Sequence, residues 1–419
     1  MPGLEEVQTT IGREDPKATL RRSLSLPLIT FYGLGTILGA GIYVLVGKVA
    51  GVAGMYAPIS FTLAAVIAGL SAFTYMELCS RHPLAGGAAV YAQQGFGVRW
   101  LSILVGFLIV LSGLVSAATI SKGFVGYFRV FIELPDVLII VTVVVALALL
   151  AAWGIAQSVA AAAVATVIEV GGLILIIAVA SASFGALPER LPELIPSFEL
   201  VAWEGIFLGG FLAFYAFIGF EDMANVAEEV KDPIRSMPRA ILLAIAISTL
   251  LYLAVSLAAV LAVPMDELTA SRAPLALMFE RSTGTSPKVM ALISLFAVIN
   301  GALIQIIMAA RMLYGMSREG WLPKGIGEVN SRTHTPIFAT ALVSIGVLVL
   351  ALALPLVTLA KVTSFAVLAV FALLGLALAR MKRAGPPAHG VYTVPAWVPY
   401  ASTVSAVALL GLQVYDLLR

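Results

Sequence analysis

Long apolar segments separated by short polar connections dominate the pattern of this chain. A helix needs about 20 apolar residues to cross the hydrocarbon core of a bilayer. Eleven segments approach or exceed this length, at 27–49, 57–78, 101–128, 137–153, 159–184, 205–226, 240–263, 289–311, 337–354, 357–380 and 398–417. The ninth and tenth are separated only by Leu354, Pro355 and Leu356, where the proline favours a turn. The pattern therefore predicts an all-α polytopic membrane protein with about 11 transmembrane helices.

Glycine residues interrupt the first and the sixth of these segments. They are Gly33, Gly35, Gly39 and Gly41 in the first, and Gly209, Gly210 and Gly219 in the sixth. A break frees backbone N–H and C=O groups that lipid cannot satisfy, so it persists only where it lines a cavity inside the protein. Matching breaks in two halves are typical of a secondary transporter with a central binding site. We therefore expect a core at 26–380 built as two inverted repeats, 27–184 and 205–380, followed by a loop and a last helix at 381–419.

The distribution of Lys and Arg sets the expected orientation. Residues 1–25 are polar, lack the apolar core and cleavage site of a signal peptide, and include Arg13, Lys17, Arg21 and Arg22. With this segment inside, the inner connections hold most of the Lys and Arg, as the positive-inside rule requires. We expect a multi-pass protein of the cell membrane with a cytoplasmic N-terminal tail.

Composition excludes several classes of function. Hydrophobic residues make up 61% of the chain and charged residues 11%, against about 25% charged in soluble domains. The formal net charge is +2 without a basic stripe, so we expect no nucleic-acid partner. Cys79 is the single cysteine and the three histidines fall in expected loops, so neither a metal cluster nor a nucleophile with a base is visible. We expect no enzyme, no metal and no cofactor.

The first break has two interpretations. Small residues at Gly39, Ala40 and Gly41 let a ligand approach the backbone, and the N–H groups that start the following half-helix favour an anion such as a carboxylate. Alternatively, Gly35 and Gly39 have the Gly-x-x-x-Gly spacing that serves close packing between helices. The segment alone supports both interpretations about equally.

Five short motifs resemble those of one transporter family. The run Gly33–Ile42 is similar to the Gly-x-x-Ile-x-Gly-x-Gly-Ile signature of the amino acid, polyamine and organocation (APC) superfamily. The other motifs are Tyr75–Leu78 with Pro83, Gly86, Gly87 and Tyr91; Ile218–Glu221; Glu228–Pro233 followed by Pro238–Ala240; and Arg311–Tyr314 with Gly320, Leu322 and Pro323. The resemblance runs from about Leu24 to Arg380. It implies a LeuT-type five-plus-five inverted repeat that transports amino acids or related amines, here with one extra C-terminal helix.

The resemblance also implies a substrate site made of backbone groups at the two breaks. Its residues are Ile37, Gly39, Ala40 and Gly41 in the first helix, and Tyr215, Ala216 and Ile218 in the sixth. The N–H groups of the first break would hold the carboxylate, and the carbonyls of Ile37, Tyr215 and Ile218 would hold the ammonium group. We expect the ring of Tyr215 to gate the site or contact the side chain of the substrate. For the neighbouring phenylalanines we expect ordinary packing.

Glu169 is the most unusual charge in the apolar segments. It lies deep in the fifth segment, and a carboxyl at such depth is functional, paired or protonated. Proton-coupled relatives carry a lysine near this place, so the resemblance implies a titratable group here although the residue type differs. We expect Glu169 to couple transport to protons; the alternative is a protonated carboxyl that bonds a backbone carbonyl of the first or eighth helix. Sodium has less support, because Ser294 and Asn300 of the eighth segment form no hydroxyl pair.

The expected substrate follows from the few polar side chains near the site. They are Thr36, Ser112, Ser116, Thr119 and Asn300. The third segment has no acidic residue placed to pair with a cationic substrate side chain, so a small or apolar neutral amino acid fits better than arginine or lysine. Because Glu169 could itself face a cationic substrate, basic amino acids and polyamines remain alternatives. We expect a secondary active transporter working by alternating access. The alternatives are an exchanger of amino acids or polyamines without protons, a substrate-binding sensor and a membrane enzyme.

Charged side chains gather at the expected inner ends of the helices. They are Glu77, Arg81, Glu221, Asp222, Glu228, Glu229 and Arg311. One interpretation is an inner gate of ion pairs, and the other is helix capping and membrane orientation.

Overall fold

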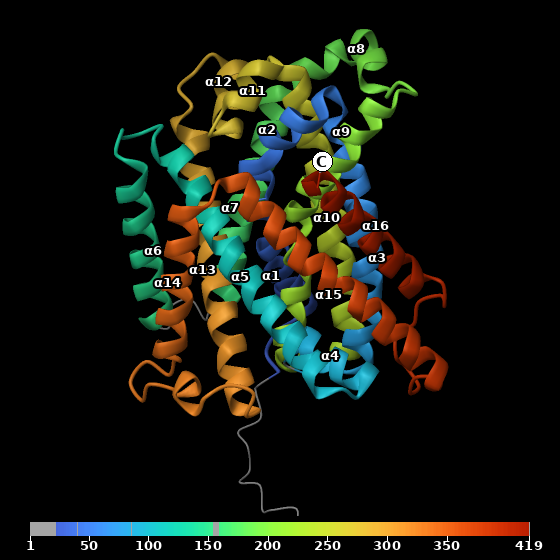
Figure 1. The fold of residues 1–419 in the computed structure, drawn as a ribbon. Coiled ribbons are helices and arrows are strands. Elements are labelled where there is room, and N and C mark those ends of the chain that lie inside the picture. The colour runs from blue at the N-terminus through green and yellow to red at the C-terminus, as the bar shows by residue number, and fades with distance from the viewer. Residues whose placement is uncertain (1–21, 40, 85, 154–158, 419) are drawn as a thin grey trace, which may run out of the picture.

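The computed structural model describes residues 22–39, 41–84, 86–153 and 159–418, and within them the protein is helical (Figure 1). The long helices are α1 (Leu26–Leu38), α2 (Gly41–Ala53), α3 (Ala57–Arg81), α5 (Arg99–Phe128), α6 (Asp136–Trp153), α7 (Val159–Val179), α9 (Leu200–Phe214), α10 (Pro233–Ala262), α13 (Lys288–Arg318), α14 (Ile337–Ala353), α15 (Leu356–Ala384) and α16 (Val398–Leu418). Shorter helices are η1 (Gly54–Tyr56), α4 (Gly87–Phe96), η3 (Ala180–Ala186), α8 (Leu187–Leu194), η4 (Tyr215–Phe217), η5 (Phe220–Glu229), α11 (Met265–Ala270), α12 (Pro274–Thr283) and η6 (Lys324–Gly327). The described residues form no strand, only an isolated bridge between Leu24 and Val230.

The helices account for the predicted membrane spans. By length and composition, nine helical stretches of the described residues could each cross a membrane, and the first of them, Leu26–Arg81, joins the first two predicted spans. The ninth predicted span is the shorter apolar helix α14. Pro355 has extended backbone between α14 and α15, which is the turn expected there. The predicted all-α polytopic membrane fold is confirmed, while the division into two inverted repeats stays a prediction.

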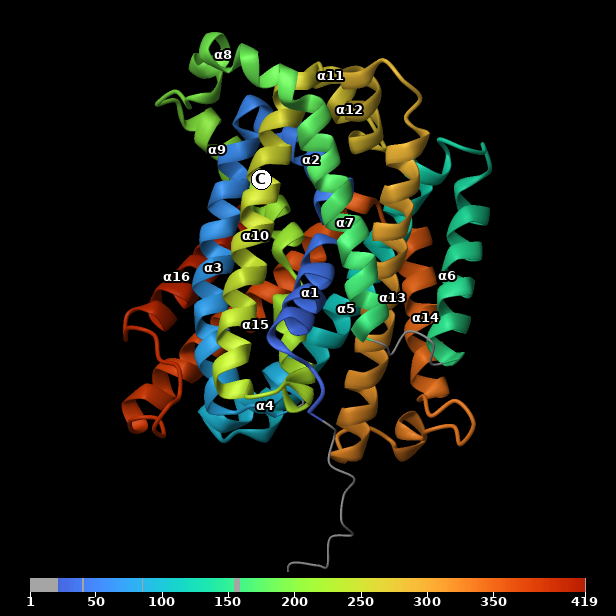
Figure 2. The same ribbon diagram turned by 180° about the vertical axis from the view of Figure 1, so that it is seen from behind.

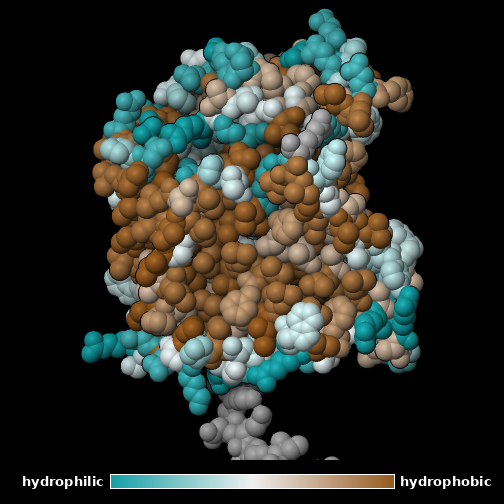
Figure 3. Space-filling view, in the orientation of Figure 1, coloured by the Kyte–Doolittle hydropathy of each residue, from teal (hydrophilic) through white to brown (hydrophobic). Residues whose placement is uncertain are grey.

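The helices form one bundle around α1. This helix packs against α10, α7 and η5, while α13 runs along α5 and α10 runs along α3. Helices α6 and α14 lie together at one edge of the bundle and α16 lies at the opposite edge (Figures 1 and 2). Figure 3 shows a broad hydrophobic belt around the middle of this face, with hydrophilic side chains gathered at both ends. This surface suits a bundle that crosses a bilayer.

Both predicted breaks are present in the backbone. Helix α1 ends at Leu38, Gly39 has φ −28° and ψ −110°, and α2 begins at Gly41. The sixth span passes from α9 through the single turn η4 to Ile218, which is extended, and Gly219, which has φ +132°. A side chain is strongly disfavoured at that φ, so glycine permits the sixth break.

The other glycines of these segments serve packing. A Cβ added to Gly33 would meet Met223, and one added to Gly35 would meet the side chain of Thr166. A Cβ on Gly209 would lie 2.7 Å from Oγ of Ser60. The first half of this glycine run therefore packs closely against neighbours and its second half interrupts the helix, while ligand binding at the break stays a prediction.

Candidate functional site

The two breaks enclose a small space inside the helix bundle. Its volume is about 20 Å³, which is room for about one water molecule. Its walls come from α1, α2, η4, α5 and α13, and are formed by Thr36, Ile37, Gly39, Gly41, Ser116, Ile120, Tyr215, Ile218, Gly301, Ile304 and Gln305. This space is too small for an amino acid, so the surrounding helices would have to move apart to admit one.

The structure brings most of the predicted site residues together. Ile37, Gly39, Gly41, Tyr215 and Ile218 all line the cavity. Ala216 lies directly behind it, since a Cβ on Gly41 would meet the backbone of Ala216. Ala40 lies outside the described residues. The binding role of these residues stays a prediction, but their common location is what a site between two breaks requires.

Helix α2 presents its N-terminal end at the cavity. It begins at Gly41 and runs for 13 residues. The first N–H groups of a helix have no partner within the helix, and the helix dipole adds partial positive charge at this end. An anionic group in the cavity would therefore be stabilised there.

The ring of Tyr215 is held across the cavity by α5. Its hydroxyl lies 3.0 Å from Oγ of Ser116 and donates over 3.3 Å to the carbonyl oxygen of the same residue. The phenylalanines beside it, Phe211, Phe214, Phe217 and Phe220, are all buried in the core. Core packing is therefore the right interpretation for these four rings, whereas Tyr215 lines the cavity and contributes a polar tip.

Two polar side chains at the site were not predicted from the sequence. Gln305 of α13 lines the cavity, and its Nε2 donates over 3.1 Å to Oδ2 of Asp222. The hydroxyl of Tyr252 of α10 is 2.8 Å from the carbonyl oxygens of both Ile37 and Ala216. Each is a polar group inside an apolar segment, and such groups need partners when buried. The sequence therefore shows that both side chains need partners, but one segment does not reveal which residues those partners are.

Glu169 lies behind the first break and does not line the cavity. Its side chain is 1% exposed, and its Oε1 accepts a hydrogen bond of 2.9 Å from Nδ2 of Asn300 in α13. Its Oε2 has no hydrogen-bond partner among the described residues. The backbone carbonyl of Glu169 accepts a bond of 2.6 Å from the hydroxyl of Tyr43 in α2. The expected alternative, a bond to a backbone carbonyl, is replaced here by the side chain of Asn300.

One turn before Glu169, α7 also contacts the other half of the first broken helix. Oγ1 of Thr166 donates over 3.0 Å to the carbonyl oxygen of Phe31 in α1. The same face of α7 thus touches α1 through Thr166 and α2 through the bond from Tyr43. Around Glu169, α7 therefore contacts both half-helices of the first break.

Three of the acidic side chains at the inner helix ends have partners that the structure shows, while the gate itself stays a prediction. Glu77 of α3 is fully buried and pairs with Arg81 at 2.7 Å and with Lys382 of α15 at 2.7 Å. Within the described part of the chain, Glu221 and Asp222 form no ion pair. Glu221 instead accepts the N–H of Gly219 over 2.9 Å, and Asp222 accepts from Gln305.

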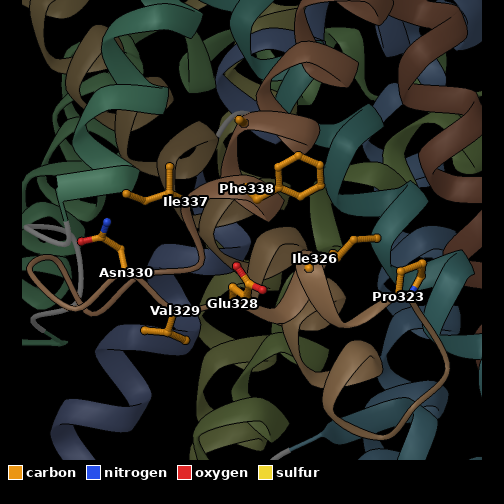
Figure 4. A pocket seen from close by; sticks show the side chains of 9 residues that line it. Pro323, Ile326, Glu328, Val329, Asn330, Ile337 and Phe338 are labelled. Atoms are coloured by element: carbon orange, nitrogen blue, oxygen red, sulfur yellow. The ribbon is translucent and has the colours of Figure 1, made fainter.

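A larger pocket lies away from the breaks, between η6 and α14 (Figure 4). Its volume is about 860 Å³, and its walls include Ile326, Val329, Ile337 and Phe338 with Glu328 as the acidic side chain. Phe338 is 59% exposed. The pocket contains no residue of the predicted site, and it lacks the convergent polar groups that orient a small ligand.

Comparisons with known proteins point to one family. The family model described as amino acid permease matches residues 24–414. The branched-chain amino acid permease BcaP of Bacillus subtilis is 26% identical over 93% of this chain and 87% of its own length. The methylthioribose transporter of the same organism is 27% identical over 95% and 89%, and the vacuolar cationic amino acid transporter 2 of Arabidopsis thaliana is 30% identical over 88% and 61%. The chain thus spans about three fifths of the plant transporter. Because the family model covers most of the chain, the protein belongs to the amino acid permease family of the APC superfamily.

Proposed function

We propose that this protein is a secondary active transporter that moves small or apolar neutral amino acids across the cell membrane, coupled to protons, by alternating access. The observation that carries the proposal is the cavity enclosed by the backbone of both helix breaks. Membership of the amino acid permease family supports the substrate class. The N-terminus would be cytoplasmic, as the distribution of Lys and Arg favours.

In this proposal the backbone binds the groups common to all amino acids. The substrate carboxylate would lie at the N-terminus of α2, where N–H groups lack partners. The ammonium group would lie against carbonyls freed by the breaks, such as those of Ile37, Tyr215 and Ile218. Because the cavity of about 20 Å³ is too small for an amino acid, the breaks must separate to admit the substrate and close again around it.

The walls of the cavity support a neutral substrate side chain. Ile120 and Ile304 are apolar, and Gly301 leaves space on α13. No carboxyl group lines the cavity in the described part of the chain. A cationic side chain would find no charge to pair with there, and burying an unpaired charge is expensive.

Glu169 would carry the coupled proton. An ionised carboxyl at 1% exposure needs partners for both oxygens, and Oε2 has none among the described residues. The neutral acid therefore suits the closed conformation, with the proton on Oε2 and Oε1 accepting from Asn300. Since the same turns of α7 contact α1 and α2, opening of the first break would expose the carboxyl to water and release the proton.

The test is uptake of a radiolabelled amino-acid panel into proteoliposomes, with and without an inward proton gradient. We expect gradient-driven accumulation of neutral amino acids by the wild type, and its loss in Glu169→Gln while substrate binding persists. Glu133→Gln, at an exposed loop residue, is the matched control and should behave as the wild type. The pH dependence of binding between about 5 and 8 should also weaken in Glu169→Gln.

Other outcomes would change the proposal. If Glu169→Gln accumulates substrate as well as the wild type, the proton role is wrong. Accumulation that follows a sodium gradient instead would replace the proton by sodium. Counterflow without accumulation would favour the exchanger, and uptake restricted to lysine and arginine would overturn the neutral side-chain preference.

A further inference from the structure

The backbones of the two breaks touch without side chains between them. A Cβ on Gly41 would lie 2.7 Å from Cβ of Ala216 and 3.2 Å from its carbonyl carbon. A Cβ on Gly219 would meet the carbonyl group of Thr36. The spacing between the breaks is therefore fixed by backbone contact, and any group that links them directly affects the shape of the cavity.

Tyr252 is such a group. It lies in α10, is fully buried, and its ring packs edge-on against Phe217 at 5.0 Å and Phe61 at 6.1 Å between centroids. Its hydroxyl is 2.8 Å from the carbonyl oxygen of Ile37 in the first break and 2.8 Å from that of Ala216 in the sixth. One hydroxyl thus joins the two breaks, which are 179 residues apart by residue number from Ile37 to Ala216.

The hydroxyl of Tyr252 does not use all the acceptor capacity of the two carbonyl oxygens beside it. A hydroxyl has one hydrogen, while each carbonyl oxygen has two lone pairs. The carbonyl of Ile37 belongs to the last turn of α1, where carbonyls lack helical donors. Ile37 also lines the cavity, whereas Tyr252 and Ala216 do not. The hydroxyl of Tyr252 therefore bonds the carbonyl oxygen of Ile37 on the side away from the cavity. This oxygen keeps a free lone pair that can accept a hydrogen bond from a ligand in the cavity.

We propose that Tyr252 is a positioning residue for the amine end of the substrate: its hydroxyl ties the first break to the sixth and orients the carbonyl of Ile37 for the substrate ammonium group. This rests on the proposed function for the identity of the ligand. Tyr252 does not touch the substrate; it acts through the carbonyl oxygens of Ile37 and Ala216.

The test compares Tyr252→Phe with Tyr75→Phe. Both changes remove one hydroxyl from a buried aromatic cluster and keep the ring. Tyr75 is a matched control because its hydroxyl has no hydrogen-bond partner among the described residues, and its ring packs on Phe220 at 5.6 Å and Phe371 at 5.4 Å. We expect Tyr75→Phe to bind substrate as the wild type does.

Binding of three ligands distinguishes a positioning role of Tyr252 from a general structural role. They are the best amino acid of the uptake panel, its N-methyl derivative and its carboxamide, each measured by binding to the purified protein. For the parent and the carboxamide, both with an intact ammonium group, Tyr252→Phe should weaken binding about five- to tenfold, the scale of one hydrogen bond. For the N-methyl derivative, which has already lost one donor, the loss should fall below about twofold, because the two changes act on the same contact.

A second measurement needs no ligand. Hydrogen–deuterium exchange of the ligand-free protein, followed by mass spectrometry, reports the opening of peptides that contain residues 33–45 and 213–220. Exchange in both peptides should rise in Tyr252→Phe and stay unchanged in Tyr75→Phe. The fold is expected to survive, since the ring and its contacts with Phe61 and Phe217 remain.

The outcomes are distinct. An equal loss for all three ligands makes Tyr252 a structural residue and overturns the proposal, as does unchanged binding. Unchanged exchange at the two breaks overturns it whether or not a substrate is known. If the wild type binds no amino acid of the panel, the proposed function fails and, with it, the assignment of the amine end, while the exchange result alone decides whether Tyr252 ties the breaks together.

Discussion

Replacing Gly41 by alanine adds one methyl group where the two breaks touch. The new Cβ would lie 2.7 Å from Cβ of Ala216 and closer still to its Cα. Side-chain carbons do not approach a backbone this closely, so α2 and η4 must separate. Because Gly41 both begins α2 and lines the cavity, the shift displaces the N–H groups proposed to hold the substrate carboxylate.

The size of the effect follows from the cost of overpacking. Extra methyl groups in a close-packed interior typically cost about 1–3 kcal/mol. In the proposed function the breaks close again around the bound substrate, so we assign this cost to that occupied state. At 1.4 kcal/mol for each factor of ten, affinity should fall about fivefold to about 150-fold.

Affinity is measured by thermal-shift titration of the purified protein with the best substrate of the uptake panel. Gly171→Ala in α7 is the matched control, because a Cβ there meets nothing within 4 Å. Gly39→Ala should have an intermediate effect, since its nearest neighbour is the Cα of Gly301 at 3.4 Å. Binding by Gly41→Ala within about twofold of the wild type would refute the close-packed site. An equal loss in Gly171→Ala would show that the assay reports general effects on the helices.

The parts of the fold that sequence reasoning predicted are those fixed by local chemistry. Hydropathy over about 20 residues marks a membrane span whatever its neighbours are, and Pro355 marks the turn between α14 and α15. The sixth break could be predicted because glycine tolerates backbone angles that other residues avoid. In the structure Gly219 does adopt such a positive φ. Gly209 looked equivalent in sequence, yet it packs within α9 against Ser60. What separates a break from a packing contact is the neighbour across the interface, which one segment does not reveal.

The contacts of the site depend on pairs of residues far apart in the chain. Glu169 was singled out from its depth in the fifth segment, but its bond to Asn300 spans 131 positions. The bond from Tyr252 to Ile37 spans 215 positions, and the sequence offers no local sign of it. Buried polar groups can therefore be recognised as needing partners, while the partner itself comes from the packing of α13 against α7 and of α10 against α1.

Two further predictions concern a hydrogen bond at the cavity and a buried ion-pair cluster. Ser116→Ala removes the hydroxyl 3.0 Å from that of Tyr215; we expect the ring to move more freely and substrate affinity to fall about two- to tenfold, in proportion to one lost hydrogen bond, and unchanged affinity would show that this bond does not shape the cavity. Glu77→Ala removes the fully buried carboxylate that pairs with Arg81 and Lys382. Losing one partner of a buried ion pair costs about 3–5 kcal/mol, because the remaining charges are left uncompensated. The thermal midpoint of the ligand-free protein should therefore fall, and a midpoint equal to that of the wild type would mean that both cations reach water when the carboxylate is absent.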